Sequence, residues 1–239
     1  MAEVTLLQPI IFALLTGVLP ALLWLWFWLK EDAHPEPKRL IVAAFFAGVL
    51  AIPIVLVLEH LAVSFLPEGV PLITSWAIIE EVIKYLAAYV AAFRAVCIDG
   101  TKCLDEPIDP LIYLITVALG FAAVENTLFL VAPFAEGEAV VGLITGNLRF
   151  IGATVLHIVA SSLIGVAMGL AFYKSRAVKR IAVVIGLFTA IVLHTFFNLS
   201  IINNNSAENI FITFGVLWIG AIILLLFFEK IRKIYRSTH

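Results

Sequence analysis

The sequence predicts an all-α protein, a polytopic transmembrane bundle of about seven helices. Of its 239 residues, 63% are hydrophobic and only 13% are charged, about half of the roughly 25% charge of an average soluble domain. Long apolar runs recur between short polar breaks, and each run reaches the roughly 20 residues that a helix needs to cross the hydrocarbon core. Because lipid offers the backbone no hydrogen-bond partners, these runs are expected to be helices.

The predicted spans are, in chain order, residues 5–29, 40–64, 73–95, 110–132, 147–173, 181–202 and 209–229. The first span has no Lys or Arg before it and no small-residue cleavage site after it, so we expect it to be retained rather than removed as a signal peptide. The connections are too short to hold a soluble domain. Residues 1–239 are therefore expected to form a single membrane domain, with a motif-bearing core at about 73–202.

The basic residues predict the orientation of the chain. Lys and Arg follow the first, third, fifth and seventh spans, whereas the N-terminus and the other breaks have none, apart from Arg149 just inside the fifth span. This positive-inside pattern predicts an N-terminus outside and a C-terminus in the cytoplasm of a multi-pass cell-membrane protein. Arg149, Glu59 and His60 lie near the predicted outer boundary, where we expect them to extend toward the lipid headgroups. The expected surroundings are the lipid bilayer, and no nucleic acid partner is expected.

Six ionisable residues lie well inside the predicted spans: Glu80, Glu81, Lys84, Glu125, His157 and His194. A charge at the centre of a bilayer costs roughly 2.5–3.5 kcal/mol even on the lenient scales, so such residues indicate partners, a water-filled cavity or a function. In the predicted orientation, a rise of about 1.5 Å per residue places one residue from each of four helices between about 11 and 15 Å below the outer boundary. These four, which are Glu81, Glu125, His157 and His194, are therefore expected to converge on one polar cavity in the outer half of the bilayer.

Helical spacing indicates how these side chains are arranged. Glu80 and Lys84 are four residues apart and can pair along one face, while Glu81 points about 100° away. One glutamate can then be neutralised while its neighbour works. His194 and Asn198 have the same spacing and share a stripe of their helix.

A ridge of small residues continues from His157 at the same spacing, through Ser161, Gly165 and Gly169. Such a ridge would let another helix approach closely.

Carboxylates and imidazoles around a wet cavity suit the activation of water. In a metal-free route, a glutamate takes a proton from water, and a His or Asn holds the developing oxyanion. In the alternative route, Glu125, His157, His194 and the glutamate Glu81 bind a divalent metal such as zinc. The sequence has no HExxH motif, which excludes a conventional zincin helix. Both routes lead to hydrolysis.

Four motifs in order resemble those of the PrsW family of intramembrane proteases. They are "EEVIK" with Glu80, Glu81 and Lys84, "GFAAVEN" with Glu125 and Asn126, "HIVASSLIGVAMG" with His157, and "HTFFN" with His194 and Asn198. The resemblance covers residues 76 to 200 and implies a glutamate-dependent endopeptidase that cuts a membrane-protein substrate. In bacteria, members of that family perform site-1 cleavage of membrane-bound anti-sigma factors. The related CAAX prenyl endopeptidases have Arg at the end of the first motif and His in place of Glu125, which disfavours prenyl-protein processing.

The predicted catalytic residues are Glu80, Glu81, Lys84, Glu125, Asn126, His157, His194 and Asn198. Glu80 or Glu81 would act as general base while Lys84 holds the other, and Glu81→Gln is expected to leave a folded, inserted protein that cannot cut. The alternative function is a proton-coupled or cation transporter that uses the Glu and His cluster as a relay, although the sequence shows no inverted repeat. A third hypothesis is a membrane scaffold without chemistry.

Overall fold

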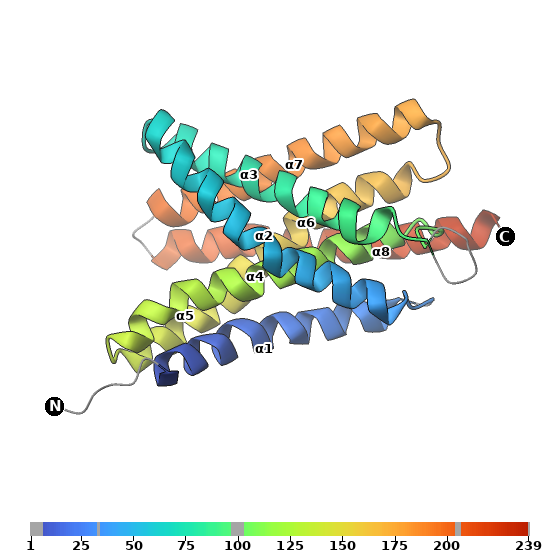
Figure 1. The fold of residues 1–239 in the computed structure, drawn as a ribbon. Helices are drawn as coiled ribbons and strands as arrows, with labels where there is room; N and C mark the ends of the chain where they lie inside the picture. Colours follow the sequence, from blue (N-terminus) through green and yellow to red (C-terminus); the bar gives the residue numbers. More distant parts are fainter. Residues whose placement is uncertain (1–6, 33, 97–102, 204–206, 239) are drawn as a thin grey trace.

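The computed structural model describes residues 7–32, 34–96, 103–203 and 207–238 of the protein. This part of the chain forms a helical bundle, which confirms the predicted fold class (Figure 1). The elements are α1 (Leu7–Glu31), α2 (Lys38–Phe65), α3 (Val70–Ala88), the π-helical turn η1 (Tyr89–Phe93), α4 (Asp109–Ala135), α5 (Ala139–Ile151), α6 (Ala153–Leu170), α7 (Arg176–Asn203) and α8 (Ala207–Thr238).

Six segments of the described chain are long and apolar enough to cross a membrane: α1, α2, α4, α5 with α6, α7 and α8. These helices make the protein a multi-pass membrane protein, as the sequence predicts. Helix α3 lies among them but carries three charged residues in its middle, Glu80, Glu81 and Lys84. The orientation, with the N-terminus outside, stays a prediction.

The predicted fifth span, residues 147–173, is wrong in its boundaries. The structure has two helices there, α5 and α6, which meet at Gly152. Gly152 has φ −109° and ψ −81°, outside the helical region. A Cβ atom at this position would lie 2.6 Å from the Phe214 ring and 2.9 Å from the Leu148 carbonyl oxygen. The missing side chain therefore lets the helix break against α8.

Helix α4 is the centre of the bundle, because every residue from Pro107 to Ala123 is buried. Helices α1, α2 and α6 pack around it. Helix α2 comes close enough at Gly48 that a Cβ there would lie 2.0 Å from the Val117 carbonyl oxygen. On the α6 side, a Cβ at Gly165 would lie 2.6 Å from the Cα atom of Leu111, which confirms the predicted small-residue ridge.

A polar cluster connects the loop between α1 and α2 to the start of α4. The Tyr113 hydroxyl donates to the Glu36 carboxylate, and Asp109 Oδ2 accepts the backbone N–H groups of Asp105 at 2.8 Å and Glu106 at 2.7 Å. Burial raises the pKa of Glu36, with the Tyr113 hydrogen bond opposing that shift. These contacts fix the end of α4 that lies away from Glu125.

Candidate active site

Helix α3 places its three charged side chains in the interior, where Glu80, Glu81 and Lys84 are all buried. The Lys84 ammonium lies 2.5 Å from Glu81 Oε1 and 3.7 Å from Glu80 Oε2. The sequence suggested a pair between Glu80 and Lys84 along one face, but the closer contact is with Glu81. Glu81 is therefore the closer ion-pair partner of Lys84.

Both oxygens of the Glu81 carboxylate are engaged. Oε1 also accepts a hydrogen bond from His194 Nδ1 at 2.8 Å, and Oε2 accepts one from the Ser161 hydroxyl at 2.9 Å. Glu81 has no exposed surface. It is placed to hold Lys84, His194 and Ser161 together rather than to face a substrate.

The two histidines face each other from α6 and α7, with ring centroids 5.4 Å apart. His157 Nδ1 lies 3.0 Å from Lys84 Nζ. Because an ammonium can only donate, Nδ1 accepts this hydrogen bond, so the proton of the neutral His157 ring is on Nε2. Nε2 in turn donates to Glu125 Oε2 at 2.9 Å.

His194 is held in a corresponding way by a different carboxylate. Its Nδ1 donates to Glu81 Oε1, so Nε2 of the neutral ring carries a free lone pair. This Nε2 lies 3.8 Å from Glu80 Oε2, the same distance that separates Glu80 Oε2 from His157 Nδ1. Glu80 Oε2 is buried and has no hydrogen-bond partner in the described residues.

Glu125 is held by Arg149, a residue that the sequence places near the lipid headgroups. Arg149 of α5 was expected to extend toward the headgroups, but its Nη2 lies 2.7 Å from Glu125 Oε2 and its Nε donates to Asn126 Oδ1 at 2.6 Å. Asn126 Nδ2 donates to the Thr154 hydroxyl at 2.9 Å. The one signal for Arg149 was its position, since it is the exception to the absence of basic residues at that end of the bundle. Asn126 thus orients Arg149.

A cavity of about 680 Å³ is lined by residues of α2, α3, α4, α5, α6, α7 and α8. Most of its wall is apolar, and its polar lining residues include Glu59, Glu80, Glu125, Thr145, Arg149, His157, His194 and Asn198. Glu81, Lys84 and Asn126 lie behind this lining. The cavity therefore exposes Glu80 and both histidines to a substrate, with Glu81 and Lys84 buried beneath them.

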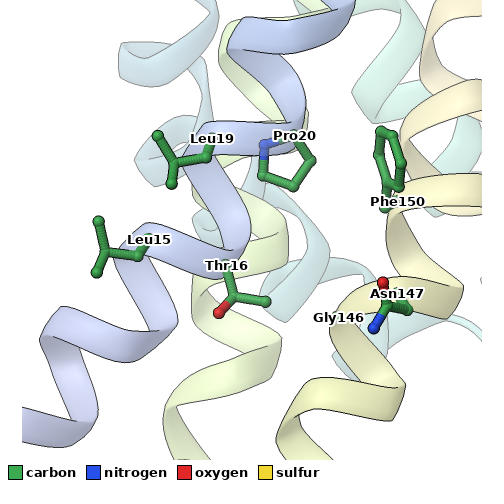
Figure 2. Close-up of a pocket in the computed structure, with 7 residues that line it drawn as sticks. All are labelled: Leu15, Thr16, Leu19, Pro20, Gly146, Asn147 and Phe150. Atoms are coloured by element: carbon green, nitrogen blue, oxygen red, sulfur yellow. The ribbon is translucent and has the colours of Figure 1, made fainter.

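A second, smaller hollow of about 280 Å³ lies between α1 and α5 (Figure 2). Its two polar side chains, Thr16 and Asn147, donate to backbone carbonyls of their own helices, those of Phe12 and Leu143. Among the described residues, no ionisable one lines this hollow. It therefore has none of the groups that hydrolysis requires.

Three side chains in the described part of the chain could hold a metal ion, namely Glu80, His157 and His194, whose ligand atoms lie within 4.8 Å of one another. This set differs from the predicted ligands, which included Glu81 and Glu125. Those two glutamates instead contact the far nitrogens of His194 and His157. A carboxylate on the second nitrogen of a histidine is the usual support for a metal ligand.

The free Glu80 oxygen and the two supported imidazoles fit a divalent metal such as zinc, which takes nitrogen and carboxylate ligands. Lys84 competes with that metal for the lone pair of His157 Nδ1, so binding requires Lys84 to release this nitrogen.

Comparison with known proteins identifies the family. The description of the family that matches residues 36–227 is "PrsW family intramembrane metalloprotease". The chain is 31% identical to Protease PrsW from Geobacillus kaustophilus over 69% of this chain and 67% of the relative. It is 28% identical to Protease PrsW from Halalkalibacterium halodurans, over 78% of this chain and 82% of the relative. It is 25% identical to Protease PrsW from Shouchella clausii, over 94% of this chain and 97% of the relative. No solved structure matches the chain. The protein therefore belongs to the PrsW family of intramembrane metalloproteases.

Proposed function

We propose that this intramembrane protease cuts its membrane-protein substrate in the cavity beside Glu80, and that Glu80 is the general base. The supporting observation is that Glu80 lines the cavity, while its buried Oε2 has no hydrogen-bond partner in the described residues and lies 3.8 Å from a nitrogen of each histidine. Glu81 was the other candidate, but Lys84, His194 and Ser161 occupy its carboxylate. Glu80 is thus the glutamate of α3 that is free to accept a proton.

In the proposed reaction, Glu80 accepts a proton from a water molecule in the cavity as the water oxygen bonds to the carbonyl carbon of the substrate. Asn198 donates a hydrogen bond to the oxyanion that this addition creates. Glu80 then gives the proton to the leaving nitrogen as the carbon–nitrogen bond breaks. Arg149 keeps Glu125 in place, and Glu125 in turn orients the His157 ring.

We further propose that His157, His194 and one carboxylate oxygen of Glu80 hold a divalent metal, which leaves the second oxygen of Glu80 to accept the proton. When bound there, such an ion would polarise the substrate carbonyl and lower the pKa of water. Glu81 and Glu125 would then set the orientation of the two histidine rings. The family description supports this proposal, since it names a metalloprotease.

The substrate that the family resemblance suggests is a membrane-bound anti-sigma factor. The apolar walls of the cavity fit a membrane-spanning segment, and the family assignment favours peptide hydrolysis over the transport of protons or cations.

The test is a pair of assays on the purified protein in proteoliposomes. A membrane-spanning peptide from an anti-sigma factor is mixed with the protein, and its products are identified by mass spectrometry. We expect a single cut within the membrane segment or at its edge, because the cavity lies between membrane-spanning helices. Uptake of protons or cations is measured in the same vesicles. Uptake without any cleavage would contradict the proposed function.

A further inference from the structure

Glu59 is an ionisable residue of the cavity to which the proposed reaction assigns no role. It belongs to α2 and lines the same cavity as Glu80. The cations of the site already have closer partners than Glu59, since Lys84 contacts Glu81 and Arg149 contacts Glu125. Glu59 forms no ion pair with a residue in the described ranges. A carboxylate in apolar surroundings is stabilised either by a proton or by an opposite charge, so this position can accept a cation.

The wall around Glu59 is open and apolar. Helix α2 packs tightly on α4 at Gly48, and beyond that point the two helices splay apart toward the connection between α2 and α3 (Figure 1). Leu56 of α2 and Phe129 of α4 line the cavity along this divergence and are 48% and 56% exposed. A substrate segment can therefore reach Glu59 from the side. Pro53 lies inside α2 between Gly48 and Glu59, where the helix loses one backbone hydrogen bond.

The position of Glu59 sets where on the substrate the cation would lie. Glu59 is six residues before the end of α2 and Glu80 is ten residues after the start of α3. A rise of about 1.5 Å per residue thus places Glu59 roughly 6 Å nearer the connection between the two helices. An extended chain covers roughly 3.3 Å per residue, so this offset corresponds to about two substrate residues.

We propose that Glu59 is the specificity-determining residue that binds a Lys or Arg side chain of the substrate, about two residues from the cut bond on the side of the α2–α3 connection. A long basic side chain suits this wall, because its hydrocarbon stem can contact Leu56 while its charge reaches Glu59. The proposal rests on the proposed function, since it places the cut bond beside Glu80.

The experiment measures the preference of the purified protein, reconstituted in vesicles, for one of two substrate peptides. One peptide has Lys two residues from the cut, and the other has Met at that position. The readout is the ratio of the two kcat/KM values. We expect Glu59→Gln to lower this preference for Lys about tenfold, as the loss of one partly buried charge pair would. With a third peptide that has Glu at the same position, Glu59→Lys should cut the Glu peptide in preference to the Lys peptide.

The matched control is His60→Gln, which changes the adjacent residue, one that is exposed and does not line the cavity. It should keep the wild-type ratio. An unchanged ratio in Glu59→Gln, or equal loss of both reactions, would overturn the proposal while leaving the protease function intact. Failure of the wild-type protein to cut either peptide would instead refute the proposed function.

The ammonium group of a zwitterionic lipid headgroup is the competing source of the charge. The ratio is therefore measured in vesicles with phosphatidylethanolamine and in vesicles with phosphatidylglycerol alone. We expect the same preference for Lys in both. If removing phosphatidylethanolamine changes the preference for Lys as much as Glu59→Gln does, the assignment of the cation to the substrate is wrong.

Discussion

Glu80→Gln is expected to abolish peptide cleavage while leaving the protein folded. Gln has nearly the same shape as Glu but cannot accept the proton of water, and general base catalysis contributes roughly 10²–10⁴-fold to such reactions. The free energy of unfolding should change little, because Glu80 Oε2 makes no hydrogen bond to a described residue. The measurement is the rate of cleavage of a membrane-spanning peptide in proteoliposomes, with the thermal midpoint recorded on the same sample.

The control for this variant is Glu68→Gln, the same chemical change at an exposed position in the connection between α2 and α3. It should cleave at the wild-type rate. If Glu80→Gln keeps cleavage within a few-fold of the wild type, Glu80 is not the base and the proposed mechanism fails.

Glu81→Gln is expected to destabilise the protein as well as to inactivate it. The sequence predicts an inactive but folded variant, whereas the structure shows Glu81 in a fully buried ion pair with Lys84. Removing one partner of such a pair leaves an uncompensated charge, at a cost of about 3–5 kcal/mol. The double variant Glu81→Gln/Lys84→Met removes both charges and should recover most of this stability. Unfolding of the three proteins in detergent micelles by denaturant measures the difference.

Cleavage separates the two roles of this pair. The double variant should remain defective, because His194 keeps no carboxylate on its Nδ1, and loss of such a partner costs roughly 10–100-fold in metal affinity or activity. A single variant as stable as the wild type would show that Lys84 does not depend on Glu81. Full activity in the double variant would show that the pair has no part in arranging the site.

The fold could be predicted because a membrane-spanning helix depends on the hydropathy of about twenty consecutive residues, and the sequence alone gives that hydropathy. The same averaging missed the break at Gly152. That break depends on a contact with Phe214 of α8, some sixty residues away in the sequence. The predicted fifth span also began late, at residue 147, whereas α5 starts at Ala139, directly after Glu136, Gly137 and Glu138.

The contacts that join Glu81, Glu125, His157 and His194 could be predicted from depth, because helical rise is fixed, but Glu81 lies behind the cavity that it was expected to line. Which glutamate faces the cavity could not be predicted. Glu80 and Glu81 are adjacent on α3, and their environments differ only through contacts that other helices supply, such as Ser161 and His194 around Glu81. Sequence spacing also favoured Glu80 as the partner of Lys84, whereas the closer contact is with Glu81.

The contact of Arg149 with Glu125 also could not be predicted from the sequence, because it depends on how two helices pack. The distance of Arg149 from the predicted membrane boundary suggested a contact with headgroups, and only the folding of α5 against α4 brings it to Glu125.

The most direct test of the central claim, that Glu80, His157 and His194 act as one metal-binding catalytic centre, is a metal titration of the purified protein. Chelator-treated protein in proteoliposomes is titrated with zinc, and bound metal and peptide cleavage are measured on the same samples. The account predicts that cleavage is lost with the metal and returns in proportion to binding, up to about one ion per chain, and that His194→Ala binds far less. Cleavage at the full rate by protein that holds no metal would contradict it.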